Sequence, residues 1–204
     1  MNGLLLPGGA IDLVDHSTHE FTPYLMSQQL IVRWEIEAFH SKQDYFPIWG
    51  TCIGMLSLAL SLANDSSVME SGFDSENMAI LLDFTMNNQE LLYNTRMFSL
   101  ESAPLGDIKG RKYASLFEHE IYPIYASQFH PEKAIFGWNT EEVINHSYES
   151  VTTNTFFGRF FVNECRKNFH RFKSSQIEDA ALIYHYNPVY TYELVRDFEQ
   201  CYFV

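Results

Sequence analysis

Short apolar runs without the alternation of a half-exposed strand are the feature that most restricts what this sequence folds into. The first is Gly3-Leu4-Leu5-Leu6, which Pro7-Gly8-Gly9 closes at once. Such a run predicts a strand buried on both faces, as strands are in parallel sheets. Two more apolar runs, residues 45–49 and 121–129, predict further strands. The chain is therefore expected to fold around a mostly parallel sheet.

Helical patterns lie between these runs. Thr22-Pro23 supplies an N-cap and a proline for the first helical position, and apolar residues then recur at helical spacing, which predicts a helix over about 23–39. Residues 53–63 are apolar on every side and predict a buried helix. A later helix should carry one apolar face marked by Phe157, Phe160, Phe161, Cys165 and Phe169. Alternating strands and helices predict a layered α/β fold.

The remaining segments are less regular. Residues 64–77 are rich in Asn, Asp and Ser and predict a loop, whereas residues 78–84 predict another strand. The tail, residues 180–204, carries so much aromatic surface that we expect it to pack onto the body. A length of 204 residues suits one domain, 1–204, rather than two.

Charge and cysteine content exclude several classes of function. The chain has 13 Lys and Arg against 26 Asp and Glu, a net charge of −13, which is the wrong sign for neutralising phosphates; we expect no nucleic-acid partner. No apolar run reaches the roughly 20 residues that span a bilayer, so neither a membrane anchor nor a signal peptide is expected in this chain. Its three cysteines are widely spaced, which argues against a disulfide framework and a zinc site.

One cysteine stands where a strand should turn into a helix, in Gly50-Thr51-Cys52-Ile53-Gly54. Flanking glycines favour a sharp turn that exposes the sulfur, and the positive end of the following helix stabilises a thiolate. A lone cysteine is more often a small buried hydrophobe. The glycines and the strand–helix context instead favour a nucleophile elbow.

A histidine and a glycine turn follow two other predicted strands. His130 is followed two positions later by Glu132, so that a base and a carboxylate that orients it stand together. Gly8 and Gly9 let backbone N–H groups approach an oxyanion, joined by the amide of Ile53. Alone, His130 would more often be a structural histidine, Glu132 a surface charge, and the glycines a simple turn.

Together these motifs are typical of a known group. Gly-x-Cys-x-Gly with His-Pro-Glu resembles the class I glutamine amidotransferase-like superfamily, whose members use a Cys-His-Glu triad. Within it the chain resembles the γ-glutamyl hydrolase family, which trims folate polyglutamates. The strings that carry the likeness are DYFPIWGTC at 44–52, QFHPEK at 128–133, FFVNECRKN at 160–168 and FEQCY at 198–202.

The resemblance implies a three-layer αβα sandwich with a flavodoxin-like sheet, a Cys52 nucleophile, a His130 general base and acid, and an orienting Glu132. It implies a thioester intermediate, a folyl or antifolyl poly-γ-glutamate substrate, and no cofactor or metal. The chain is shorter than the family pattern before Met1 and between Phe98 and Tyr113. The sheet is therefore expected to lack its first strands, which would leave residues 3–6 at an apolar edge.

Further expectations are weaker. Asn64 and Asn145 begin glycosylation sequons, in keeping with the lysosomal, vacuolar or extracellular location that the resemblance implies. A homodimer is an open possibility. Two other functions are weighed against hydrolysis: a shortened, non-catalytic member that keeps the triad, and a glutamine amidotransferase subunit that delivers ammonia to a synthase.

Overall fold

The computed structural model describes residues 1–70, 72–73, 77, 79, 113–194 and 200–203. They fall into two compact units, Asn2–Phe169 and His170–Val204, the second grouped with Met1. The strand predicted for residues 78–84 lies outside the described residues, apart from position 79. That residues 1–204 form one domain, and that the aromatic tail packs onto the body, stay predictions.

The larger unit is built on a four-stranded sheet of order β1-β2-β4-β3. The strands β1 (Leu4–Leu6), β2 (Ile48–Thr51) and β4 (Ile124–Ser127) run parallel, and β3 (Leu116–Glu118) is antiparallel to β4. In register, Leu6 lies opposite Gly50, and Gly50 opposite Ala126. The prediction of a mostly parallel, flavodoxin-like sheet is confirmed.

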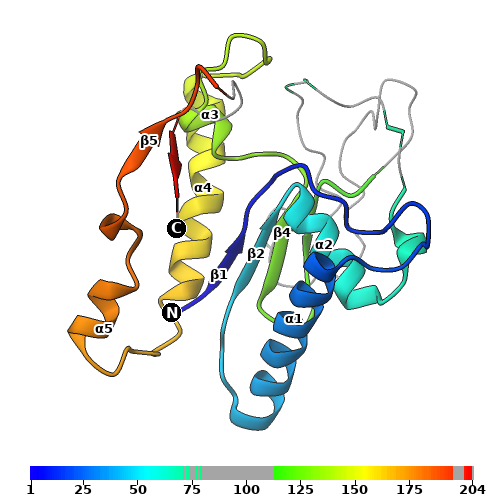
Figure 1. Ribbon diagram of the computed structural model, residues 1–204, viewed down its shortest axis with the longest axis vertical. Helices are drawn as coiled ribbons and strands as arrows, with labels where there is room; N and C mark the ends of the chain where they lie inside the picture. Colours follow the sequence, from blue (N-terminus) through cyan, green and yellow to red (C-terminus); the bar gives the residue numbers. More distant parts are fainter. Residues whose placement is uncertain (71, 74–76, 78, 80–112, 195–199, 204) are drawn as a thin grey trace. The chain divides into compact units, whose positions relative to one another are not determined.

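Helices cover both faces of this sheet (Figure 1). On one face α1 (Pro23–Lys42) packs against α2 (Ile53–Ala63), and α2 packs on β2. On the other lies α4 (Tyr148–Cys165). The prediction of a three-layer αβα sandwich is confirmed.

Successive side chains of β2 and β4 point to opposite faces of the sheet, so they contribute to two separate hydrophobic clusters. Ile48 and Ile124 belong to the α1/α2 side, in a cluster of aliphatic residues with Val32 and Leu58. Their neighbours in sequence, including Trp49, belong to an aromatic cluster that the phenylalanines of α4 complete: Trp49, Leu116, Tyr125, Phe157, Phe160 and Phe161. β2 and β4 are thus buried at every position and on both faces, as parallel strands are.

The first helix follows its sequence signals closely. Thr22 caps α1, accepting a hydrogen bond from the amide of Leu25, and Pro23 is the first helical residue. The helix continues three residues past the predicted end at 39 and stops at Gln43, which adopts a left-handed conformation with φ 52°. The predicted helix over 53–63 is α2, none of whose residues is exposed.

Boundaries of the second and third strands were predicted less well. Residues 45–47 precede β2, and Gly50, which follows the predicted strand 45–49, lies inside β2, where α2 approaches it closely. Only residues 124–127 of the predicted strand 121–129 are in β4, and β3 was not predicted. The loop predicted over 64–77 contains one short 3-10 helix, Ser66–Val68.

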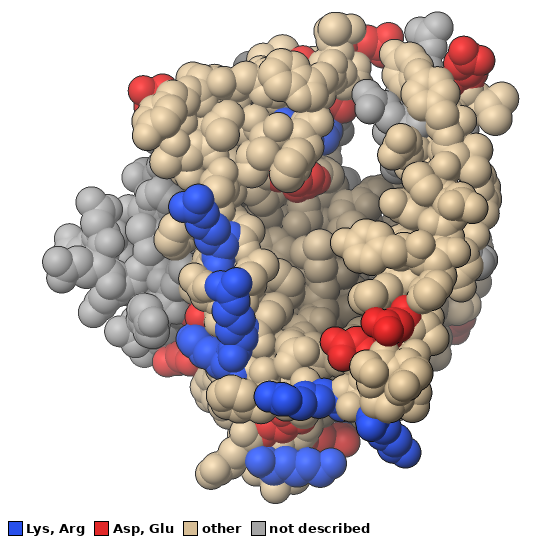
Figure 2. Space-filling model, turned by 90° about the vertical axis from the view of Figure 1, so that its left-hand side faces the viewer, with Lys and Arg blue, Asp and Glu red and all other residues tan. Residues whose placement is uncertain are grey.

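The end of α4 also differs from its predicted pattern, because Phe169 lies beyond the helix rather than on its apolar face. Asn168 donates from its side chain to the carbonyl of Tyr45, 2.8 Å away, which holds the chain as it leaves the helix. Nearby, Arg166 donates to Asn163, and Lys167 pairs with Glu164 at 2.6 Å. Cations at this C-terminal end of α4 are favoured by the negative end of the helix dipole. In the view of Figure 2, Lys and Arg side chains stand among mostly uncharged ones.

β1 stands at one end of the described sheet and is apolar at every position. β1 pairs only with β2 among the described strands. Leu6 is buried in the aliphatic cluster, whereas Leu5, which points to the opposite face, is 54% exposed. β1 therefore buries the side chain on one face and exposes the side chain on the other.

The smaller unit has little regular structure. It contains α5 (Ser175–Ala180), a 3-10 turn at Ile183–His185, and a two-stranded antiparallel sheet of β5 (Pro188–Tyr190) and β6 (Gln200–Tyr202). Cys201 lies opposite Val189 and within 3.3 Å of the Thr191 hydroxyl. None of the described helices, in either unit, combines the length and apolar character needed to cross a bilayer.

Candidate active site

Cys52 lies between β2 and α2, at the N-cap of the helix. Its backbone adopts φ 56° and ψ −112°, a conformation that non-glycine residues rarely take and that costs free energy. Its amide donates to the carbonyl of Ser127 at the end of β4, 2.8 Å away. The strained elbow is therefore held by the neighbouring strand.

The two flanking glycines act differently from what the motif suggested. A Cβ on Gly50 would lie 2.5 Å from the carbonyl oxygen of Gly54, and a Cβ on Gly54 would lie 2.3 Å from that of Leu6. Both distances are too short for any other residue. The glycines let α2 lie directly against β1 and β2, while the positive φ belongs to Cys52 itself.

His130 follows β4 and lies between the other two members of the predicted triad. Its Nδ1 is 2.6 Å from Oε1 of Glu132, which stands at the N-cap of the short helix α3 (Lys133–Phe136). The ring also hydrogen-bonds the Cys52 sulfur. Because Nδ1 faces the carboxylate, Nε2 is the nitrogen left for sulfur. Cys52, far from His130 and Glu132 in the chain, thus meets them at the carboxyl edge of the parallel strands.

These contacts stabilise the charged form of each group. The hydrogen bond from His130 lowers the pKa of the Cys52 thiol against the opposing effect of burial. The hydrogen bonds with Cys52 and then Glu132 raise the pKa of His130 to about 9. For Glu132, burial favours the neutral acid, but the hydrogen bond with His130 outweighs it and the pKa is lowered. Together the contacts favour the thiolate, the imidazolium and the carboxylate over their neutral forms.

Backbone amides complete the surroundings of the sulfur. The N–H groups of Ile53 and Gly9 both hydrogen-bond Cys52 and help to lower its pKa. Gly8 fills a different place: a Cβ there would lie 2.4 Å from Cε1 of His130 and 3.3 Å from Cβ of Cys52. The predicted glycine turn therefore reaches the site, with Gly9 donating to the sulfur and Gly8 giving the imidazole room.

Two contributions to the site were not found from the sequence. One is the carbonyl of Ser127, which anchors the elbow. The other is the steric role of Gly8. No local signal points to Ser127, because only the strand register brings it opposite Thr51. The glycine turn was visible as a motif, but not the ring that packs on it.

The two sequon asparagines lie outside this site. Asn64 ends α2 with φ 50° and accepts a hydrogen bond from Gln29, and Asn145 accepts one from the amide of Ser147. Both are exposed. Within the described part of the chain no cluster of three or more His, Cys, Asp or Glu is arranged to hold a metal ion.

Comparison with known proteins finds several relatives with one description. The chain is 31% identical to human γ-glutamyl hydrolase over 240 residues, covering 99% of this chain and 71% of the relative. It is 31% identical to γ-glutamyl hydrolase B of Dictyostelium discoideum over 95% of this chain and 64% of the relative. The rat γ-glutamyl hydrolase is 30% identical over 99% of this chain and 71% of its own. No protein-family model matches the chain.

Proposed function

Because the chain belongs to the γ-glutamyl hydrolase family, we propose that it hydrolyses the γ-glutamyl bonds of folyl or antifolyl polyglutamates, with Cys52 as nucleophile. The observation that carries this proposal is the position of His130, which bonds the Cys52 sulfur on one side and Glu132 on the other. This is the arrangement that an activated cysteine nucleophile requires. Neither a metal nor a cofactor enters the proposed reaction.

In the first half of the reaction the Cys52 thiolate attacks the carbonyl carbon of a γ-glutamyl amide. The carbonyl oxygen becomes an oxyanion, which we assign to the amides of Ile53 and Gly9, since both already point at the sulfur. As the C–N bond breaks, the imidazolium of His130 gives its proton to the departing amine. The products are a thioester on Cys52, a free amine and a neutral imidazole.

In the second half water cleaves the thioester. The neutral His130 takes a proton from the attacking water, and the C–S bond breaks to return the thiolate and release a γ-carboxyl group. The proton remains on His130, which restores the ion pair. Glu132 holds the ring in orientation throughout and stabilises the imidazolium.

The direct test incubates pure protein with a pteroyl polyglutamate and separates the products by chromatography, with Cys52→Ala as the matched control. We expect shorter chains or free glutamate from the wild type alone. Equal, background-level trimming by both proteins contradicts the proposal and favours the non-catalytic alternative. Glutaminase activity without polyglutamate cleavage favours the amidotransferase alternative.

The same proposal includes the binding partner, the cellular location, the glycosylation and the oligomeric state of the protein. The partner is a small anionic substrate rather than nucleic acid or membrane, and the location is the lysosome, vacuole or extracellular space. Asn64 and Asn145 are proposed to be glycosylated there, which a mass shift on enzymatic deglycosylation of the protein from its native source tests. A homodimer is tested by analytical ultracentrifugation.

A further inference from the structure

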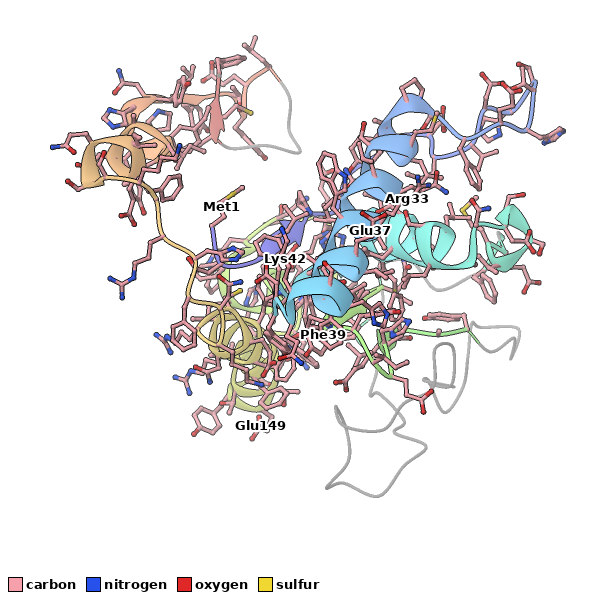
Figure 3. All side chains as sticks on the ribbon, turned by 90° about the horizontal axis from the view of Figure 1, so that it is seen from below. Met1, Arg33, Glu37, Phe39, Lys42 and Glu149 are labelled. Atoms are coloured by element: carbon pink, nitrogen blue, oxygen red, sulfur yellow. The ribbon has the colours of Figure 1, made fainter. Side chains whose placement is uncertain are left out.

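The buried face of α1 contains a glutamate where hydrophobic residues are expected. Its inward stripe is Leu25, Gln28, Val32 and Glu35, at helical spacing. Glu35 is only 4% exposed. Arg33 and Glu37, labelled on α1 in Figure 3, are exposed instead. The helix thus carries one glutamate inward and a second outward, two residues apart.

Nothing in the described part of the protein bonds the Glu35 carboxyl group. Neither of its oxygens has a hydrogen-bond partner there, and the same is true of the Oε1 atom of Gln28. Buried side-chain oxygens nearly always have a partner, because burying a polar group without one is costly. Burying an unpaired carboxylate costs the most free energy, and a carboxyl group in such a place avoids this cost by staying protonated.

Among the described elements packed on α1, none brings a positive charge that would offset an ionised Glu35. The packed helix α2 contains no ionisable side chain at all. The strands facing α1 contribute only hydrocarbon, from Leu6, Ile48, Phe117, Ile124 and Ala126. Tyr122 also packs on this cluster, and its hydroxyl bonds His40 at the end of α1.

The charged group that acts on Glu35 is another acid. Burial, and then the negative charge of Asp44 just after α1, raise the pKa of Glu35 to about 8. The sign of the effect on stability follows. A carboxyl whose pKa is raised in the folded state stabilises the fold fully below its unfolded pKa near 4.5, and this stabilisation is lost as the pH rises through about 8.

We propose that Glu35 is a proton-operated switch for α1: protonated, it lets α1 lie on the sheet, and ionised, it drives α1 away. The switch reaches the candidate site through α2. α1 packs on α2, and α2 begins directly after Cys52, so a loosened α1 also loosens the helix that shapes the elbow. The proposal concerns the fold and holds whether or not the protein cleaves γ-glutamyl bonds.

A second carboxyl on the other face of the sheet acts in the same direction. Glu118 of β3 and Glu164 of α4 line one cavity of about 270 Å³, together with Tyr45, Tyr125 and Lys167. Burial, followed by the charge of Glu164, raises the pKa of Glu118 to about 8, against the opposing effect of Lys167. On each face of the sheet, therefore, one buried carboxyl group favours its protonated form.

The test measures thermal unfolding of the wild type, Glu35→Gln and Glu37→Gln between pH 5.5 and 9. One linked proton changes the unfolding constant by up to about tenfold per pH unit. We expect the Tm of the wild type to fall as the pH rises toward 9, and the Glu35→Gln variant, neutral at every pH, to lose much of that fall. Glu37→Gln, with the same change on the exposed side, keeps the wild-type slope.

The proposal is overturned if Glu35→Gln keeps the wild-type pH dependence. A second measurement needs no variant: carbon-13 NMR of the folded wild type with labelled glutamate carboxyl groups. We expect two glutamates to titrate near pH 8, of which Glu118→Gln removes one. If no glutamate then titrates above pH 6, Glu35 is ionised in the fold and the switch does not exist.

Discussion

Two polar clusters in this protein favour opposite charge states. At the candidate site Cys52 and His130 are half-buried and Glu132 is exposed, and their contacts favour thiolate, imidazolium and carboxylate. Beneath α1, burial and Asp44 favour the neutral form of Glu35. The two clusters differ in depth and in the neighbours of their acids. One imidazole between two acids stabilises both charges, whereas an acid beside hydrocarbon and another acid cannot keep its own.

Removing that imidazole should have the largest effect on this contrast, because Cys52, like Glu35, would then lack a partner that stabilises its charged form. In His130→Gln the thiolate loses its largest stabilising contact, and its pKa should rise. We expect alkylation of Cys52 at pH 6 to slow by at least about tenfold, and the proposed hydrolysis to fall by about a thousandfold.

Mass spectrometry of iodoacetamide-treated protein measures the first effect for each cysteine separately. His16→Gln is the control, since His16 is exposed and pairs only with Asp12 at 3.4 Å. An unchanged alkylation rate in His130→Gln would mean that the helix N-terminus alone activates the sulfur.

Gly8 and Gly9 offer a sharper, steric version of the same test. A methyl group at position 8 would collide with the His130 ring at 2.4 Å, whereas a Cβ at position 9 has nothing within 4 Å. Displacing a catalytic group by about 1 Å typically costs about a hundredfold. We therefore expect Gly8→Ala to lower kcat/KM by about 10- to 100-fold, with Gly9→Ala much closer to wild type. Equal losses would show that the turn acts through its backbone freedom and not through room for the ring.

The third prediction concerns the carboxylate that supports the imidazolium. Glu132→Gln keeps the shape but removes the charge next to Nδ1, 2.6 Å away. The pKa of His130 should then fall below about 9, so the imidazolium is lost at lower pH and the alkaline limb of activity moves toward acid. Proton NMR titration of the His130 ring checks the direction of this pKa change. Glu142→Gln is the control, because the Glu142 carboxylate pairs with Lys133. A titration that does not move contradicts the role given to Glu132.

Glu164 is an intermediate case, a buried acid that does have partners. It pairs with Lys167 and accepts hydrogen bonds from the hydroxyls of Tyr45 and Tyr125. Burial, and then the hydrogen bond to Glu164, raise the pKa of Tyr45, which keeps its hydroxyl a donor at every ordinary pH.

Removing one donor should therefore cost stability. Tyr45→Phe should lower the free energy of unfolding by about 1.5–3 kcal/mol, the usual range for a hydrogen bond to a charged group. Urea denaturation measures it. Tyr24→Phe is the control: its ring packs in a separate cluster near Leu25. A Tyr45→Phe protein as stable as the control would show that Lys167 and Tyr125 are enough to satisfy Glu164.

The parts of this molecule that the sequence predicted well are those with a local physical cause. The cap and proline at 22–23 begin α1, and the glycine-flanked cysteine between strand and helix is at the elbow. The missed features depend on what is adjacent in space. β3 is short and pairs antiparallel with β4, and its Glu118 breaks the apolar run that a buried strand normally shows.

Glu35 shows the same limit on the helix. Helical spacing alone does not distinguish an inward glutamate at position 35 from an outward one at position 37, because α1 has a weakly amphipathic pattern. Likewise, Gly50 reads as a strand breaker until Gly54 is seen against it. The sequence predicts which residues can carry the chemistry. It does not predict their neighbours in space, which decide the charge that each residue holds.

The smallest expected effect extends the contrast to apolar groups, in one strand. Leu6 and Leu5 are neighbours in β1, but Leu6 packs in the aliphatic cluster while Leu5 is 54% exposed at the edge of the described sheet. Leu6→Thr should lower the free energy of unfolding by about 2–4 kcal/mol, because it buries a hydroxyl and leaves a cavity. Leu5→Thr should change it by less than about 0.5 kcal/mol. The second variant should instead reduce self-association in sedimentation velocity, because an exposed apolar edge strand invites pairing between copies. If Leu5→Thr costs as much stability as Leu6→Thr, the side chain at position 5 is covered in solution and β1 is not an edge.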